Sequence, residues 1–257
     1  MVKKLATRSL HRAGLVGTLK SIFRRNRGRA LLIQQNHDRK VDIEVVQEIL
    51  LNKGYNVRLI PPQMCTRKNV LFRLEELSSV SRDDSASFFY YAGHGSEVPG
   101  YVNGIMTNDV NSSVFPWQNR LVPYELLTEL GKIRGKKAIV IDSCFSGEFV
   151  EEARGLYNDG LIKDYVIITS TTRDGKSISS SSFDLPNTHP LKGSCITPLT
   201  HWIYECLRGR ARNLANLPFL RYECVPSETI NQDEQEGIVD SRINLEMQRV
   251  GDSDFIL

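Results

Sequence analysis

Short apolar runs alternate with amphipathic segments along most of this chain, and this alternation limits its fold more than any other feature. The runs that predict strands lie at 29–34, 55–60, 87–92, 137–142 and 164–170, with a last one at 254–257. Segments with apolar residues at helical spacing lie at 41–52, 67–80, 122–133 and 196–207. Strands separated by single helices form a mostly parallel sheet with helices on both faces. The expected class is therefore α/β.

The first 28 residues differ in composition from the rest. Residues 1–29 contain nine Lys or Arg and no Asp or Glu, and because the whole chain carries +3, the remainder carries −6. We expect a basic N-terminal arm or pro-segment at 1–28 and one domain at 29–257. Three interpretations of the arm stay open, beside that of a solvated tail: an organellar targeting peptide, a contact with an acidic partner or surface, or a segment packed against the domain.

Composition excludes several classes of protein. No apolar run approaches the roughly 18 residues that span a bilayer, so we expect no transmembrane segment. Five cysteines without CxxC spacing argue against a disulfide framework and against a structural zinc site. A reducing, cytoplasmic location follows from this cysteine usage. Nucleic-acid binding is not expected, because the basic arm has no accompanying aromatic motif.

Two expected strands end in unusual residues. The run SFFYYA leads into Gly93-His94-Gly95, and KAIVID leads into Ser143-Cys144. In a parallel sheet the carboxyl ends of neighbouring strands open into one crevice, so His94 and Cys144 would face each other there. An imidazole that accepts a thiol proton makes a cysteine nucleophilic. The glycine-rich setting would let the backbone N–H groups of Gly95 and Cys144 form an oxyanion hole.

Together these motifs carry a family resemblance. YYAGHGS and VIDSCFSG, with His94 fifty residues before Cys144, resemble the paired motifs of metacaspases and related caspase-like peptidases of family C14, clan CD. The segments TSTTRDGKS and GSCITPLTHWI extend the resemblance more weakly. It implies a caspase-like three-layer sandwich around a six-stranded, mainly parallel sheet. It also implies a cysteine endopeptidase that uses the His94–Cys144 dyad and a thioester acyl-enzyme.

Substrate selection depends on acidic candidates near these motifs. Asp142 precedes the nucleophile by two residues, where metacaspases place an acidic residue of the pocket for the side chain before the scissile bond, P1. A carboxylate there favours Arg or Lys. Asp42 matches the upstream acidic pocket residue by position, and equally fits a partner for a helix dipole. Asp174 is a third candidate, and cleavage after Arg or Lys is the expectation.

Many metacaspases need calcium, but this sequence has acidic residues at only part of the expected ligand positions. Asp109 and Glu151 match two ligand positions by their offset from the motifs, but the adjacent acidic pair expected nearby is Pro123-Tyr124. Hard cations require several oxygen ligands. We therefore expect no metal or other cofactor, and weak or absent calcium dependence.

Self-processing is a further expectation. The segment 148–163 is expected to be a linker and contains Arg154 and Lys163, so a peptidase specific for basic residues could cut itself there or within 1–29, as a zymogen does. Solvated loops explain the same residues equally well. Phe145 stands where many metacaspases have His, and activity should survive this change because the position is outside the dyad.

Two other functions compete with the peptidase. A catalytically silent caspase-like scaffold would recruit partners, and the retained His94 and Cys144 speak against it. A serine-dependent α/β hydrolase would need a GxSxG turn, which DSCFSG does not supply.

Overall fold

A computed structural model of the chain describes residues 28–96, 102–109, 119–171, 183–184, 189, 191–192, 194–207 and 247–250. Residues 1–27 of the basic arm, the candidate Asp174 and the expected strand at 254–257 lie outside the described residues. Within the part that is described, no helix has the length and apolar content needed to cross a membrane.

The centre of the fold is a six-stranded sheet in the order β11-β8-β7-β3-β1-β2. Its strands are β1 (Arg29–Gln34), β2 (Asn56–Ile60), β3 (Ala86–Ala92), β7 (Lys136–Asp142), β8 (Tyr165–Thr169) and β11 (Met247–Val250). Five of them run parallel, and β11 pairs antiparallel with β8 at one edge. The expected six-stranded, mainly parallel α/β sheet is confirmed, with its sixth strand at Met247–Val250.

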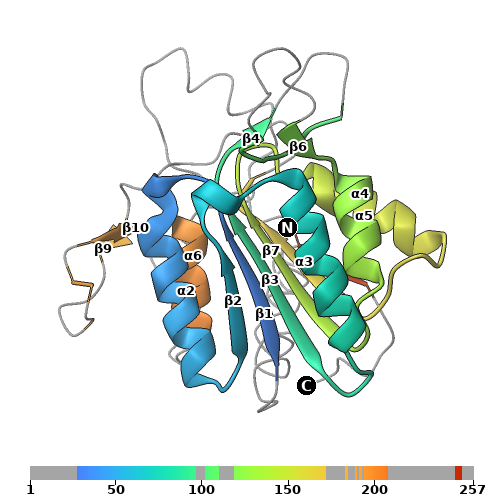
Figure 1. The fold of residues 1–257 in the computed structure, drawn as a ribbon, viewed down its shortest axis with the longest axis horizontal. Helices are drawn as coiled ribbons and strands as arrows, with labels where there is room; N and C mark the ends of the chain where they lie inside the picture. Colours follow the sequence, from blue (N-terminus) through green and yellow to red (C-terminus); the bar gives the residue numbers. More distant parts are fainter. Residues whose placement is uncertain are drawn as a thin grey trace, which may run out of the picture.

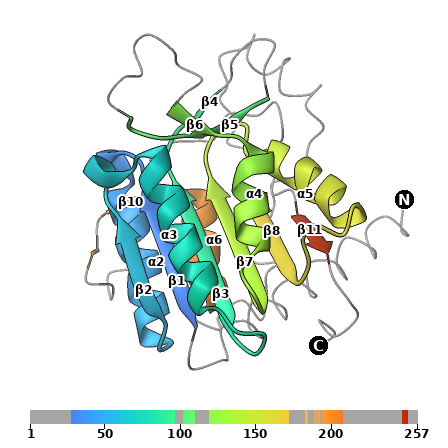
Figure 2. The same ribbon diagram turned by 45° about the vertical axis from the view of Figure 1, so that its right-hand side comes forward.

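Helices cover both faces of this sheet and complete a three-layer sandwich (Figure 1). The pair α2 (Lys40–Asn52) and α6 (Pro198–Leu207) lies on one face. The other face carries α3 (Arg67–Val80), α4 (Pro123–Gly131) and α5 (Glu148–Asn158), which Figure 2 shows side by side. Two short 3-10 turns, η1 (His37–Arg39) and η2 (Pro62–Met64), follow β1 and β2.

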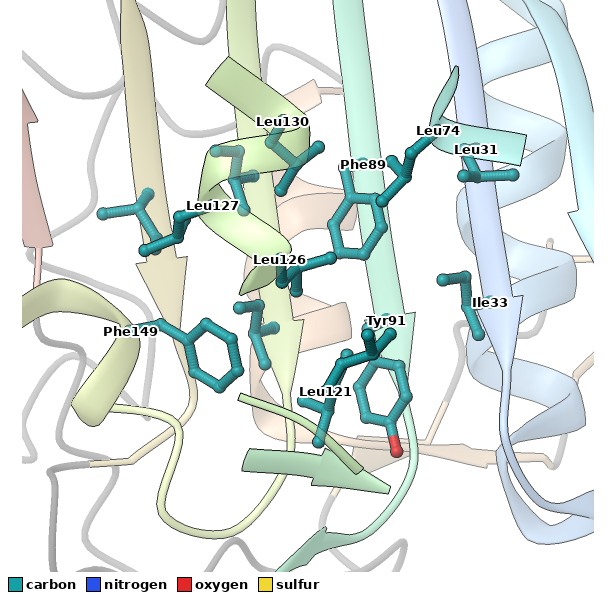
Figure 3. Packing of buried hydrophobic residues seen from close by; sticks show 14 of the residues in the cluster. Leu31, Ile33, Leu74, Phe89, Tyr91, Leu121, Leu126, Leu127, Leu130 and Phe149 are labelled. Atoms are coloured by element: carbon teal, nitrogen blue, oxygen red, sulfur yellow. The ribbon is translucent and has the colours of Figure 1, made fainter. Parts of the chain in front are cut away.

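Side-chain alternation along the strands divides the buried residues into two cores. Successive residues of a strand point to opposite faces, so a sheet covered on both sides must be apolar throughout. All seven residues of β3 are buried. Phe88 and Tyr90 join the core under α2 and α6, whereas Phe89 and Tyr91 join the core under α3, α4 and α5, shown in Figure 3.

The expected linker at 148–163 is wrong for most of its length, because residues 148–158 form α5. Phe149, Val150, Ala153 and Leu156 are buried against the sheet. They recur at the spacing of one helix face. The charged residues between them lie on the outer side, which gave this segment its polar composition.

Small β elements lie outside the main sheet. Strands β4 (Gly95–Ser96), β5 (Gly104–Met106) and β6 (Arg120–Leu121) form a three-stranded sheet beyond the carboxyl ends of the main strands (Figure 1). A second pair joins β9 (Phe183–Asp184) to β10 (Cys195–Ile196). The carboxyl end of the main sheet, where His94 and Cys144 lie, is therefore bordered by additional structure.

Candidate active site

His94 and Cys144 leave the sheet from adjacent strands. β3 and β7 pair in parallel, with Ala92 opposite Asp142, so each candidate lies two residues beyond the last registered pair. The pairing continues for one residue, because the Gly93 N–H donates to the carbonyl of Asp142 at 3.1 Å. His94 is exposed and Cys144 is partly exposed. The sequence prediction that both residues emerge at the same end of neighbouring strands is met.

Gly95 brings the His94 segment against the backbone of Cys144. A Cβ added at Gly95 would lie 1.8 Å from the carbonyl oxygen of Cys144 and 2.7 Å from its carbonyl carbon. No side chain can occupy that space, because the obstructing atoms are backbone. Glycine is therefore required here by a close approach of two chain segments.

Side chains that follow β1 hold the histidine. The His94 N–H donates to Gln35 Oε1 at 3.2 Å, and the Asn36 amide nitrogen lies 3.0 Å from His94 Nε2. The Tyr91 hydroxyl donates to the His94 carbonyl at 2.7 Å. The contact with Asn36 lies at Nε2, not at Nδ1, and fixes the orientation of the ring.

Cys144 lies in a tight turn between β7 and α5. The next residue, Phe145, has φ +57°, in the left-handed region that costs an L-residue roughly 1–2 kcal/mol. Such strained residues gather at functional sites, where the surrounding structure holds them in place.

Hydroxyl groups from the end of β8 hold this turn. Ser170 Oγ donates to the Ser143 carbonyl at 3.0 Å, and the Ser146 N–H donates to Thr171 Oγ1 at 3.0 Å. Ser146 Oγ in turn accepts from the Thr171 N–H at 3.2 Å. All four residues are buried, so these hydrogen bonds fix the turn on both sides of Cys144.

Asp42 and Asp142 meet in one buried polar cluster. Asp42 is 1 % exposed and Asp142 is fully buried. Thr197, just before α6, connects them: its N–H donates to Asp42 Oδ1 at 2.8 Å, and its hydroxyl donates to Asp142 Oδ2 at 2.5 Å. Thr200 extends the cluster, with Oγ1 2.9 Å from Thr197 Oγ1 and 2.7 Å from the Tyr90 hydroxyl.

The position of Asp42 separates its two sequence interpretations. It lies in the first turn of α2, as a dipole partner would, but it points towards α6 and accepts a hydrogen bond from Thr197 there. A partner of the helix dipole alone would not need these tertiary contacts. The structure therefore brings two of the three acidic candidates together, and the third, Asp174, lies outside the described residues.

Burial and like charge act together on Asp42. Burial, and then the negative charge of Asp142, raise the pKa of Asp42 to about 6, against the hydrogen bonds from Thr197 and Thr200 and the charge of Arg39. A second carboxylate nearby disfavours ionisation of the first. The same burial and the same two carboxylates raise the pKa of Tyr90 well above its ordinary value, so its hydroxyl stays neutral.

Arg39 is the cation of this cluster. It ends η1 just before α2, is 6 % exposed, and places Nη1 3.8 Å from Asp42 Oδ2. Burial lowers the pKa of Arg39, but the charges of Asp142 and Asp42, with smaller contributions from Tyr90 and Cys144, outweigh it and raise this pKa overall. The guanidinium is therefore electrostatically linked both to the acidic pair and to Cys144.

The two calcium candidates of the sequence are not brought into a cluster. Asp109 Oδ2 accepts from the backbone N–H of Arg67, at the start of α3, at 3.0 Å and from the Thr107 hydroxyl at 2.6 Å. Glu151 lies exposed on α5. Among the described residues, no three His, Cys, Asp or Glu side chains gather as metal ligands.

Asn36, Arg39 and Thr197 are among the members of the site that sequence reasoning missed. Arg39 precedes Asp42 by three residues across the start of a helix, a spacing typical of an ion pair, which was an available signal. Thr197-Pro198 is a helix-start pattern, and Thr197 Oγ1 does accept the Thr200 N–H at 3.2 Å. Nothing local marks Asn36, whose contact with His94 spans 58 positions.

Cys144 also differs from the other cysteine whose side chain the structure describes. Cys65 is fully buried, and burial raises the pKa of its thiol to about 12. A protonated, inaccessible thiol is a poor nucleophile. Of these two, Cys144 is the one that a substrate can reach.

Solved structures resemble this fold at low sequence identity. A crystal structure of a protein from Geobacter sulfurreducens matches with a TM-score of 0.51 and 13 % identity, over 90 % of this chain and 96 % of that chain. Caspase-1 from Spodoptera frugiperda matches with a TM-score of 0.50 and 12 % identity, over 89 % of this chain and 88 % of that chain. At these identities the likeness concerns the fold alone.

Sequence comparison gives the family. No curated protein sequence matches the chain. The family model described as Caspase domain (Peptidase C14) matches residues 27–214, which include His94, Cys144 and the polar cluster around Asp142. With that match over most of its length, on a sheet and helices arranged as the resemblance implies, this chain belongs to the caspase-domain family of peptidases.

Proposed function

We propose that this chain is a cysteine endopeptidase that cleaves after Arg or Lys, with Cys144 as nucleophile and His94 as its proton-transfer partner. The observation that carries the proposal is the placement of both residues two positions beyond a registered strand pair. The close packing of Gly95 on the Cys144 backbone supports it, because this packing joins the two loops into one site.

In the proposed reaction His94 takes the thiol proton and Cys144 Sγ attacks the scissile carbonyl carbon. The developing oxyanion faces the backbone N–H groups of Gly95 and Cys144. The C–N bond then breaks as His94 returns the proton to the leaving amine, which leaves a thioester on Cys144. A water molecule, deprotonated by His94, hydrolyses the thioester and restores the thiol.

The preference for a basic side chain rests on the acidic pair. Asp42 and Asp142 are two carboxylates in one cluster, on the sheet face under α2 and α6, at the same strand end as the nucleophile. A guanidinium or ammonium group gains most from charge-assisted pairing where water is excluded. Asp174 is proposed as a third contributor.

We also propose that the enzyme needs no calcium and can process itself. Two observations support calcium independence. Asp109 Oδ2 already accepts a hydrogen bond from the start of α3, and Pro123 and Tyr124 occupy the positions where an acidic pair is expected. Self-processing is supported by Lys163, which lies exposed in the connection between α5 and β8. Arg154 is exposed but helical, which makes it a poorer site, because cleavage requires an extended backbone. The basic arm at 1–28 offers further sites, or a contact for an acidic partner.

A peptide panel tests this function. Fluorogenic peptides that differ only in P1 Arg, Lys or Asp are incubated with the purified chain, with added calcium and with chelator. We expect hydrolysis of the Arg and Lys peptides, loss of all hydrolysis in Cys144→Ala, and rates within about twofold with and without calcium, since half a ligand set binds Ca²⁺ poorly.

Two results would refute the proposal. Faster turnover of the Asp peptide would refute the basic specificity. If a peptidyl-Arg chloromethyl ketone fails to label Cys144 in a folded, monodisperse sample, the chain is a silent scaffold instead.

A further inference from the structure

Arg39 occupies the acidic cluster with an unusually poor fit. Its side chain is 7 % exposed, and its Nη1 lies 3.8 Å from Asp42 Oδ2, within reach of charge but too far for a hydrogen bond. This Nη1 is buried without a hydrogen-bond partner among the described residues. A buried guanidinium usually pairs with a carboxylate through two parallel hydrogen bonds. Charge, rather than hydrogen bonding, therefore keeps this part of Arg39 in place.

The carboxylates of Asp42 and Asp142, in contrast, accept hydrogen bonds from residues other than Arg39. Thr197 donates to both of them, and a hydrogen bond from Thr200 also lowers the pKa of Asp42. Two carboxylates stand against one guanidinium, so one negative charge remains when both are ionised. The remaining negative charge therefore favours the binding of a second cation, or of one that forms better hydrogen bonds with the carboxylates than Arg39 does.

The backbone that carries Arg39 is weakly fixed at its start. Arg39 ends the one-turn helix η1 and stands at the N-cap of α2, and neither η1 nor α2 begins with a capping side chain. Uncapped first turns lose part of the hydrogen bonding that stabilises a helix end. A modest change in η1 would withdraw the guanidinium while α2, with its buried apolar face, stays packed.

We propose that Arg39 is the internal occupant of the P1 pocket, and that a basic substrate side chain must displace its guanidinium from Asp42 and Asp142. This inference rests on the proposed function and adds to it a residue that sets the strength of selection. Arg39 supplies a competing positive charge at a fixed position, so it weakens the binding of every peptide with Arg or Lys at P1. Peptides with a neutral P1 side chain do not compete with it.

The experiment compares Arg39→Gln with the wild-type chain. Glutamine removes the charge and keeps a polar side chain, shorter than that of arginine. Lys40→Gln is the matched control, because Lys40 is the next residue, has a 69 % exposed side chain, and pairs with Glu44 on the surface. We measure kcat and KM for peptides with P1 Arg and P1 citrulline, the neutral isostere of Arg. Arg39→Gln should lower KM for the Arg peptide by about tenfold, the effect of one modest charge pair, and should lower it more than KM for the citrulline peptide. Lys40→Gln should leave kcat and KM for both peptides unchanged.

A binding measurement decides the same question without turnover. Butylguanidine, a small alkyl cation, is titrated into each protein during thermal unfolding, with butylurea as the neutral control. A ligand that binds only the folded state stabilises it by RT ln(1 + [L]/Kd), so tighter binding at the same ligand concentration gives a larger rise in Tm. The increase with butylguanidine should be larger in Arg39→Gln than in the wild-type chain or in Lys40→Gln, and butylurea should give none.

Equal or weaker binding of the cation by Arg39→Gln would overturn the inference, as would equal losses for the Arg and citrulline peptides, which indicate a structural role. If Arg39→Gln does not fold, the double variant Arg39→Gln/Asp42→Asn removes one charge of each sign and must still bind butylguanidine more tightly than the wild-type chain. Failure of the proposed function gives a different result: no peptide is hydrolysed by any of these proteins, while the Tm comparison still decides the role of Arg39.

Discussion

Replacing Asp42 with asparagine should make the chain's stability less dependent on pH, in a direction set by burial. The pKa of Asp42 is raised from 3.8 to about 6 in the folded chain. Between these two values the folded state keeps a proton that the unfolded state has lost, so the free energy of unfolding falls as pH rises from about 4 to about 6. A shift of about two pKa units corresponds to about 3 kcal/mol. The amide of asparagine cannot titrate, so the Asp42→Asn variant lacks this loss.

The assay is urea unfolding of both proteins at pH 4.5, 5.5, 6.5 and 7.5, followed by the fluorescence of tryptophan, including the buried Trp202 of α6. The difference in unfolding free energy, variant minus wild type, cancels the groups that titrate in both. We expect this difference to rise by about 2 kcal/mol across the series, because pH 4.5 to about 6 covers about 1.5 of the pKa units. Asp38→Asn is the control, because Asp38 is exposed in η1 nearby and its replacement should change stability by at most about 0.5 kcal/mol.

A flat difference, or one that falls with pH, would refute this reasoning. A falling difference would mean that the pair with Arg39 outweighs burial and the repulsion from Asp142. Arg39 would then be a firm partner of Asp42, and its displacement by a substrate would become unfavourable.

Three further predictions concern the site and the sheet. Gly95→Ala should lower kcat/KM by about 100-fold, because its Cβ would lie 1.8 Å from the Cys144 carbonyl and must push the two loops apart. Asn36→Ala should lower kcat by about tenfold, because the imidazole of His94 loses a partner at Nε2 that positions it. Lys137→Met should remove a rise in stability of about 3 kcal/mol between pH 8 and about 10.5, measured by urea unfolding. Burial lowers the pKa of Lys137 to about 8, so over that range the unfolded state binds the extra proton.

Each of these predictions has a contrasting variant or result. Gly155→Ala, with nothing within 4 Å of the added Cβ in α5, should keep activity and stabilise the chain by up to about 1 kcal/mol. If Asn36→Ala and Asn36→Gln both keep the wild-type kcat, the contact with His94 has no role in turnover. A wild-type stability that stays level or falls above pH 8 would show that burial does not control Lys137.

The sheet was predictable because each strand carries a local signal. The runs at 29–34 and 87–92 are largely apolar on both faces, and the structure places β1 and β3 inside the sheet, each between two neighbouring strands. The helix at 67–80 has the expected bounds. Strands of two or three residues, such as β4 to β6, contain too few positions to show a period, so the sequence could not indicate them.

Helix α5 was misjudged from composition, and the sixth strand has a partner far away in the sequence. Phe149, Val150, Ala153 and Leu156 have helical spacing, but Glu and Arg residues between them make the mean composition polar, and composition was given too much weight. The strand β11 pairs with β8, about eighty residues earlier in the sequence. Partner choice of that kind depends on tertiary structure and leaves no local trace.

The residues of the site also divide into those that local sequence indicated and those that only the fold reveals. His94, Gly95 and Cys144 stood out because small residues flank them at strand ends, where chemistry collects. Arg39 could be related to Asp42 by spacing along the helix, but its link to Asp142 runs across more than one hundred positions. Only folding shows that one guanidinium is shared by two candidates that the sequence treated as separate.

The two cores that the sheet separates assign different tasks to the two helix layers. Tyr90 and Asp142 face α2 and α6, and Asp42, Arg39, Thr197 and Thr200 belong to or adjoin those helices. The opposite layer contributes apolar packing through α3, α4 and α5. Changes to that packing can therefore alter how firmly the chain folds while the choice of substrate stays the same. Under the proposed function, discrimination between substrates is concentrated in the layer of α2 and α6, where a single substitution would redirect it without rebuilding the sheet.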